Sequence, residues 1–139
     1  MAKRKTWLKK KHSVLLAKLQ NDYFNPYIKY SKFEQGYTNC ISCGKPLTLN
    51  THDCQAGHYI PISVSSRLRF EEDNVWPQCS RCNKFMEGNS ANYRDSLVDI
   101  LGIDRVEEIE SLRHDMKKYT RNELVDMIFD YKEKLEEYK

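Results

Sequence analysis

The sequence predicts an α+β protein, mainly helical, in which a small metal-bound core is flanked by helices at both ends. Two C-x-x-C pairs, Cys40/Cys43 and Cys79/Cys82, bracket a stretch of β-favouring residues, and helical apolar patterns precede and follow this stretch. Only 40% of the 139 residues are hydrophobic and 31% are charged, so the core must be small. A bound metal ion would help to stabilise such a core.

The amino-terminal part predicts helix. Apolar residues recur at helical spacing over residues 7–22, and Pro26 is expected to end or break that helix because proline has no backbone N–H. A second short helix is expected over residues 27–30. Residues 1–20 carry seven Lys or Arg and no acid, which fits either a solvated, mobile tail or a contact with phosphates.

The middle of the chain predicts strands and turns. Each cysteine pair places two thiolates on a tight turn, and Gly44 follows the first pair where the chain turns back. Residues 47–63 predict a β-hairpin and residues 67–73 a loop. A helix is expected to begin near Asn83, directly after the second pair.

The carboxyl-terminal part predicts three helices. The first covers residues 90–101 and stops at Gly102, and the second runs from residue 104 to about 117. The third begins at Thr120, which can form a capping box with Glu123. Its apolar stripe predicts either core packing or a dimer seam. The stripe consists of Leu124, Met127, Ile128, Tyr131, Leu135 and Tyr138.

The two cysteine pairs predict a structural zinc site. Four anionic sulfurs match the tetrahedral preference of Zn²⁺ and leave no open coordination position. No apolar run is long enough for a membrane span, so we expect a soluble, cytoplasmic protein whose paired cysteines bind metal rather than form disulfides. The fifth cysteine, Cys54, is then a leftover thiol, expected to be a small buried side chain.

Zinc would hold His58, inside the bracketed stretch, close to Asn83. A neutral imidazole can take a proton from water near pH 7, and an amide oxygen suits Mg²⁺. That combination predicts hydrolysis of a phosphodiester. Taken alone, His58 would more often be a packed, hydrogen-bonded residue.

The sequence resembles a known family in several short motifs. It is similar to the zinc-containing His-Asn-His (HNH) nucleases of the endonuclease VII type, and more closely to the phage NinG (Rap) recombination family. The matching segments are Cys40-Ile-Ser-Cys43-Gly44, Ala56-Gly57-His58-Tyr59, Leu68-Arg69-Phe70, Asp73-Asn74-Val75, Gln78-Cys79, Cys82-Asn83 and Gly88-Asn89 through Tyr93-Arg94. The resemblance implies a treble-clef-like ββα-metal core and metal-dependent cleavage of branched DNA, such as Holliday junctions and D-loops.

The resemblance also implies roles for individual residues. His58 would be the general base, Asn83 a ligand of catalytic Mg²⁺ or Mn²⁺, and Asn74 a brace for the hairpin that presents His58. The second metal ligand is open, because Gly57 and Gln55 stand where related proteins carry Asp. The alternatives that we consider for it are Gln55, Asp53 and Glu87.

Basic residues near His58 and Asn83 in sequence could contact DNA phosphates, although each alone could also be ordinary surface charge. They are Arg67, Arg69, Arg81, Lys84 and Arg94. Residues of this kind agree with recognition of branch shape rather than of base sequence.

The sequence suggests three segments. They are residues 1–24, a basic tail and helix; residues 25–103, the nuclease core; and residues 104–139, helices that pack on the core or form a dimer seam. The leading hypothesis is a phage-encoded, structure-selective DNA endonuclease, with a homodimer or recombination proteins as possible partners. Two alternatives are a non-catalytic zinc module that binds branched DNA and a sequence-specific HNH endonuclease.

Overall fold

The computed structural model describes residues 2–139, which form two compact units. The terminal unit combines the described residues up to Tyr27 with Lys118–Lys139, and the central unit is Ile28–Lys117. This division differs from the boundaries that the sequence suggested, because residues 104–117 belong to the central unit. Each unit is described separately.

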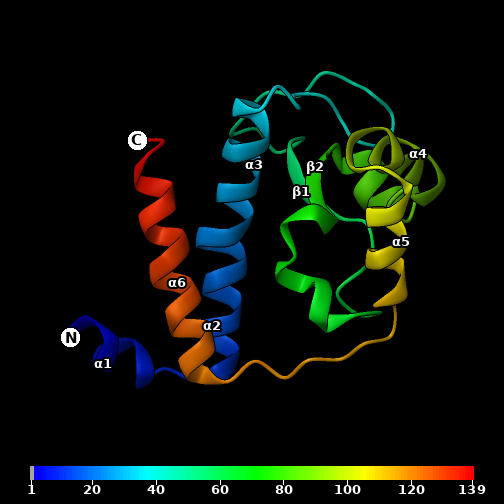
Figure 1. The fold of residues 1–139 in the computed structure, drawn as a ribbon. Helices are drawn as coiled ribbons and strands as arrows, with labels where there is room; N and C mark the ends of the chain where they lie inside the picture. Colours follow the sequence, from blue (N-terminus) through cyan, green and yellow to red (C-terminus); the bar gives the residue numbers. More distant parts are fainter. Residues whose placement is uncertain (1) are drawn as a thin grey trace. The chain divides into compact units, whose positions relative to one another are not determined.

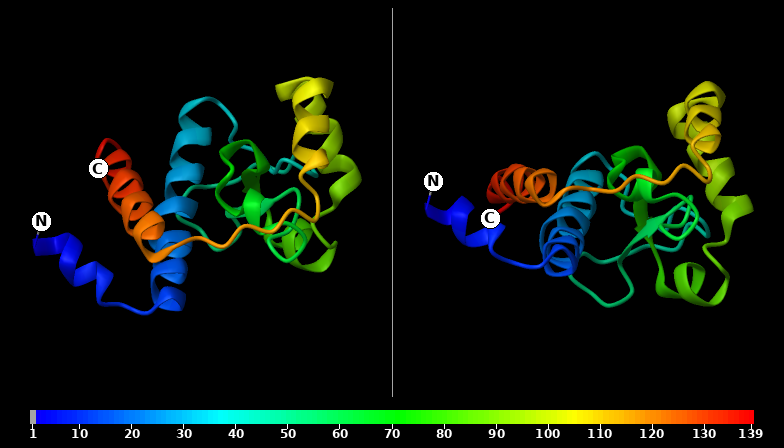
Figure 2. Two further views of the ribbon diagram at one scale, coloured as in Figure 1. Left: turned by 60° about the horizontal axis from the view of Figure 1, so that its bottom comes forward. Right: turned by 90° about the horizontal axis from the view of Figure 1, so that it is seen from below.

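Helices build the terminal unit. They are α1 (Ala2–Leu8), α2 (His12–Lys18), the π-helical turn η1 (Leu19–Phe24) and α6 (Arg121–Glu136). Figures 1 and 2 show α2 and α6 side by side. Phe24 packs edge-on against Tyr131, with ring centroids 5.1 Å apart. Most of the apolar stripe of α6 is therefore buried within a single chain.

The start of α6 is as predicted. The Thr120 side chain accepts a hydrogen bond from the Glu123 N–H at 3.1 Å, and the Glu123 carboxylate accepts one from the Thr120 N–H at 3.1 Å. This reciprocal capping box satisfies two backbone donors at the helix start.

The amino-terminal helices differ from the prediction in two ways. Trp7 lies in α1, which ends at Leu8, and a new helix begins at His12. Pro26 does not end the helix, because α3 (Asn25–Glu34) follows η1 directly. The Asn25 N–H bonds to the Gln20 carbonyl in the wider π turn, and such a turn accommodates a ring that has no N–H to donate.

A two-stranded antiparallel sheet lies at the centre of the central unit (Figure 1). Strand β1 (Gln55–His58) pairs with β2 (Val75–Gln78), in the register Gln55 opposite Gln78 and His58 opposite Val75. The second strand therefore lies outside the predicted hairpin region of residues 47–63. The connection contains two 3₁₀ turns, η2 (Ser66–Phe70) and η3 (Glu72–Asn74), where a loop was predicted.

Helices α4 (Ser90–Leu101) and α5 (Ile103–Ser111) lie side by side (Figure 2). The predicted bounds of α4 are confirmed, and Gly102 stops it with φ at 86°. Helix α5 ends earlier than predicted, since the buried Ser65 hydroxyl lies 2.9 Å from the carbonyls of Leu112 and Asp115. The two helices enclose the core of this unit. Its buried members are Ile41, Tyr59, Ile60, Leu68, Trp76, Tyr93, Leu97, Val106 and Ile109.

Lys32 is a buried cation in the central unit. Its side chain on α3 is 5% exposed, its Nζ lies 3.5 Å from the Trp76 ring centroid, and it donates to the Glu72 carbonyl at 3.1 Å. Burial lowers the pKa of Lys32 from 10.5 to about 8, against the opposing effect of Asp73 and its acidic neighbours. Between these two pH values the unfolded chain binds a proton that the folded one has lost, so stability rises with pH across this window.

Replacing Lys32 with Met is therefore expected to raise the free energy of unfolding at pH 7 by about 1 to 3 kcal/mol. Methionine keeps contact with the Trp76 ring without a charge to desolvate. The gain should shrink as the pH rises from 8 towards 10.5, and chemical denaturation at several pH values measures it. The exposed Lys84→Met is the control and should change little. A loss of stability at pH 7 would contradict this reading of Lys32.

Candidate metal centre and active site

The four paired cysteines meet in one cluster. All four sulfur atoms of Cys40, Cys43, Cys79 and Cys82 lie within 4.8 Å of one another, and the Cys43 and Cys79 sulfurs are 3.8 Å apart. Tetrahedral zinc with Zn–S bonds of about 2.3 Å separates its sulfurs by about 3.8 Å. The cluster therefore fits a zinc ion without rearrangement of the chain.

Backbone hydrogen bonds shape both cysteine turns. In the first turn the Gly44 N–H bonds to the Cys40 carbonyl at 2.9 Å, and Gly44 has a φ of 77°, which glycine adopts readily. In the second turn the Asn83 N–H bonds to the Cys79 carbonyl at 3.0 Å. The Ile41 N–H donates to the Pro77 carbonyl of β2 at 3.0 Å, so the first turn is attached directly to the sheet.

Gln78 links the two cysteine turns, a role that sequence analysis missed. Its Nε2 donates to the Ser42 hydroxyl at 2.9 Å and to the Gly88 carbonyl at 2.6 Å, and the residue is fully buried. Its Oε1 lies over Gly57, where a Cβ atom would be 1.9 Å away. A glycine inside a strand often marks such a close approach, so Gly57 is the sequence signal from which this contact could have been predicted.

Two of the predicted metal ligands touch each other. The Asn83 Nδ2 donates to the Gln55 Oε1 at 2.8 Å, and the Gln55 Nε2 donates to the His52 carbonyl at 3.2 Å. Asn83 lies in the π-helical turn η4 (Arg81–Phe85), where a helix start was predicted. The fold thus brings the first strand to the residue that follows the last cysteine.

The other two candidate ligands lie in different surroundings. Asp53 accepts hydrogen bonds from the Ser80 N–H and hydroxyl, both at 3.0 Å, and pairs with Lys45 at 2.7 Å. These contacts lower the pKa of Asp53 to about 2, with Lys45 the largest cause, and both carboxylate oxygens are engaged. Glu87 follows η4 in a left-handed turn, with φ at 49°, so the helical spacing assumed for it does not hold.

His58 occupies the end of β1 and is held by η2. Its Nε2 lies 2.9 Å from the Arg69 carbonyl, and burial lowers the pKa of the imidazole below its ordinary 6.5. A neutral ring that donates through Nε2 carries its acceptor lone pair on Nδ1. Because side chains alternate along a strand, His58 and Gln55 project to opposite faces of β1.

Asn74 ties the chain after His58 to the connection between the strands. Its Oδ1 accepts from the Ile60 N–H at 2.9 Å, and its Nδ2 donates to the carbonyls of Ile60 and Leu68 at 3.1 and 3.2 Å. The side chain is fully buried. Asn74 therefore joins the segment that follows β1 to the turn η2.

The candidate DNA-binding residues lie in three kinds of surroundings. Arg67 pairs with Asp115 at 2.7 Å, and Arg94 donates two hydrogen bonds to Glu110 at 2.7 and 3.0 Å. Arg81 and Lys84 on η4 are exposed. The Arg69 guanidinium lies 5.6 Å from the Phe70 ring centroid. Ion pairing thus engages part of the predicted basic set in contacts within the protein.

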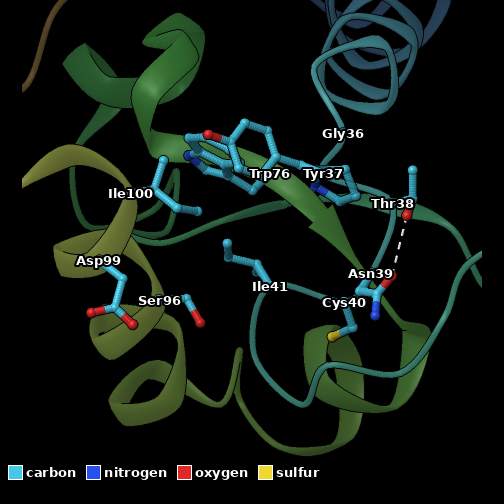
Figure 3. Close-up of a pocket in the computed structure, with 11 residues that line it drawn as sticks. Gly36, Tyr37, Thr38, Asn39, Cys40, Ile41, Trp76, Ser96, Asp99 and Ile100 are labelled. Carbon is cyan, nitrogen blue, oxygen red and sulfur yellow. Dashed lines mark hydrogen bonds between the residues drawn. The ribbon is translucent and has the colours of Figure 1, made fainter.

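Two hollows lie beside the cysteine cluster. One, of about 390 Å³, is lined by Cys43, Lys45, Cys79, Arg81, Cys82, Met86, Asn89 and Asn92. The other, of about 330 Å³, lies between the chain around Tyr37 and helix α4, and Figure 3 shows Ile41, Trp76 and Ile100 around it with Cys40 at its edge. Tyr37 and Trp76 meet there edge-on, with ring centroids 5.0 Å apart.

Comparison with known proteins identifies the family. The family model described as "Bacteriophage Lambda NinG protein" matches residues 1–139. This chain belongs to the NinG family. NinG proteins of Salmonella phage P22 and Escherichia phage lambda are 39% and 38% identical to it over 98 residues, which is 70% of this chain and 46% of each relative.

The match to these NinG proteins is partial in length, since the chain spans about half the length of the relatives that it matches. None of the solved structures matches the chain. Over the described residues, the helices are too short or too polar to span a membrane.

Proposed function

We propose that this NinG-family chain is a metal-dependent endonuclease of the HNH type that cuts branched DNA during recombination. The observation that carries the proposal is the 2.8 Å hydrogen bond between Asn83 and Gln55 beside the cysteine cluster. Gln55 lies on the strand that also carries His58. Two amide side chains thereby meet at one end of β1, and the imidazole of His58 stands at the other end of the same strand. Such a set suits phosphodiester hydrolysis better than nucleophilic or redox chemistry.

The amides would hold the cation. Rotation of the Asn83 amide about its last torsion turns Oδ1 towards the Gln55 Oε1, so that both oxygens could face one ion. When bound, Mg²⁺ or Mn²⁺ would stabilise the negative charge on the phosphate and on the leaving oxygen. Both ligands are neutral, so we expect weaker binding than at a site with a carboxylate.

His58 would activate the water. Its Nε2 is oriented by the Arg69 carbonyl at 2.9 Å, which leaves Nδ1 to accept a proton. Because burial lowers the pKa of His58, the ring is neutral and ready to act as a base at pH 7. Asn74 would keep the strand that carries His58 in place through its bonds to Ile60 and Leu68.

One observation favours a second candidate function, a non-catalytic zinc module that binds branched DNA. Both candidate ligands are amides already joined by a hydrogen bond, and His58 is half-buried and bonded to a backbone carbonyl. Such a module would keep the cysteine cluster and the exposed cations of η4, and would lack Mg²⁺-dependent cleavage.

The proposal is tested with a labelled four-way junction and purified protein in Mg²⁺. His58→Ala is expected to reduce nicking at least about 100-fold, because general acid–base catalysis contributes roughly 10²–10⁴-fold. Asn83→Ala is expected to reduce it by at least about the same factor, because it removes one of the two oxygens that would hold the cation. Zinc content and the circular dichroism spectrum should stay unchanged. His52→Ala, which changes an exposed histidine in the same segment, is the control and should cut normally. A wild-type protein that binds the junction tightly but never cuts it would favour the non-catalytic module.

A further inference from the structure

Phe85 and Met86 form an exposed apolar tip that begins two residues after Asn83. Phe85 is 81% exposed, more than any other large hydrophobic side chain in residues 2–139, and Met86 is 45% exposed. Isolated apolar residues on a surface need no explanation, but an aromatic ring exposed to this degree beside a second apolar residue does. The tip is therefore a candidate binding surface.

Backbone hydrogen bonds to the second cysteine turn hold the tip in place. The Met86 N–H bonds to the Arg81 carbonyl at 3.0 Å, and the Gly88 N–H bonds to the Cys82 carbonyl at 2.8 Å. The Gly88 carbonyl accepts hydrogen bonds from both Ser42 and Gln78, at 3.2 and 2.6 Å. Phe85 is thus presented from a braced turn, which lowers the entropy cost of binding something against it.

The charges around the tip indicate what that partner is. Arg81 and Lys84 lie on the same turn and are exposed, and the structure gives neither of them an ion pair within residues 2–139. An apolar ring flanked by free cations matches a partner that is anionic at its edge and flat and apolar inside. A nucleic acid with an accessible base face has this chemistry.

We propose that Phe85, supported by Met86, is a wedge that inserts against an unstacked base at the branch point of DNA, while Arg81 and Lys84 contact the adjacent phosphates. This inference rests on the branched-DNA part of the proposed function and not on cleavage. Inserting a side chain into a fully stacked duplex costs unstacking energy, and that cost is smallest where base stacking is already interrupted. The wedge would thus favour branch points over linear duplex.

The test measures binding without cutting. A four-way junction with 2-aminopurine at the branch point is titrated with the purified protein in Ca²⁺, alongside a linear duplex of the same sequence. Wild-type protein should raise the 2-aminopurine fluorescence of the junction. Since stacking on an aromatic ring contributes about 1–3 kcal/mol per base, Phe85→Ala should weaken junction binding roughly 5- to 150-fold and abolish the fluorescence rise.

Matched variants separate stacking from folding and from general surface effects. Phe85→Trp should restore junction affinity and fluorescence, because an aromatic face is retained. Met116→Ala removes another apolar side chain that is 62% exposed and should leave both signals unchanged. Duplex affinity should change less than about twofold in every variant.

Three outcomes decide the inference. Loss of the fluorescence rise in Phe85→Ala supports it even when the wild-type protein fails to nick, in which case the endonuclease proposal alone falls. Normal junction binding by Phe85→Ala, in a protein that does nick, overturns it. The inference is also overturned if Phe85→Ala binds the junction as tightly as the wild-type protein but light scattering shows a monomer where the wild-type protein is a dimer. The tip would then bind a second copy of this chain.

Discussion

Cys79→Ser is expected to lose bound zinc and to abolish the cooperative fold of the central unit. Structural zinc contributes apparent binding energies of about 10–16 kcal/mol in small zinc-binding peptides, whereas a whole domain is stable by only about 5–15 kcal/mol. The four sulfurs join the ends of a long excursion of chain that includes both strands. Metal analysis and a near-ultraviolet circular dichroism melt measure the two effects.

Cys54→Ala is the matched control for this experiment. Cys54 is also buried, at 2% exposure, but its sulfur is outside the four-sulfur cluster. This variant should keep its zinc and lose about 1 kcal/mol, as expected for removing one small buried group. If Cys79→Ser instead remained folded and bound a full equivalent of zinc, the cluster would not be the metal site.

Gly57→Ala is the second variant for which we expect a large effect. The new Cβ atom would lie 1.9 Å from the Gln78 Oε1 and 2.9 Å from the Gln78 Cβ, so the Gln78 side chain must leave its place. When it leaves, its bonds to Ser42 and Gly88 break, and these two residues keep only the bond between them. Overpacking and lost hydrogen bonds together should lower the free energy of unfolding by about 2–4 kcal/mol, measured by chemical denaturation.

A double-mutant cycle identifies the cause of that loss. Gln78→Ala alone should cost about 1–3 kcal/mol, because it removes the two hydrogen bonds of the buried Gln78 amide and leaves Ser42 and Gly88 only the bond between them. The pair Gly57→Ala with Gln78→Ala should cost clearly less than the sum of the single changes, by about 1 kcal/mol or more, since the 1.9 Å clash with Oε1 is gone and only the 2.9 Å contact between the two Cβ atoms remains. Additive losses would mean that the close approach of the Gln78 side chain to Gly57 is not the cause of the loss.

Features that depend on neighbouring residues were predictable from the sequence. The capping box of α6 needs only Thr120 and Glu123, and the end of α4 needs only the freedom of Gly102. The clustering of the four cysteines followed from ligand chemistry, since two C-x-x-C pairs in one small domain have few alternatives to a shared metal.

Features that depend on distant residues were not predictable in this way. The partner of β1 comes from residues 75–78, and no local pattern distinguishes it from a partner within residues 47–63. Asp53 seemed available as a metal ligand until the fold placed Ser80 and Lys45 on it. The continuation of helix past Pro26 likewise depends on a π turn, which propensity alone does not reveal.

The terminal unit is built from two segments that are far apart in the sequence, and this arrangement sets an order for folding during synthesis. Its helices come from both sides of the central unit, whereas the central unit is one uninterrupted stretch, Ile28–Lys117. Residues 28–117 therefore leave the ribosome complete, cysteines included, before α6 exists to cover α2 and η1. Until α6 is made, the apolar side chains of Leu15, Leu19 and Phe24 lack the helix that buries them. We therefore expect any dependence on chaperones to arise from the helices that are made first, and not from the cysteine-rich core.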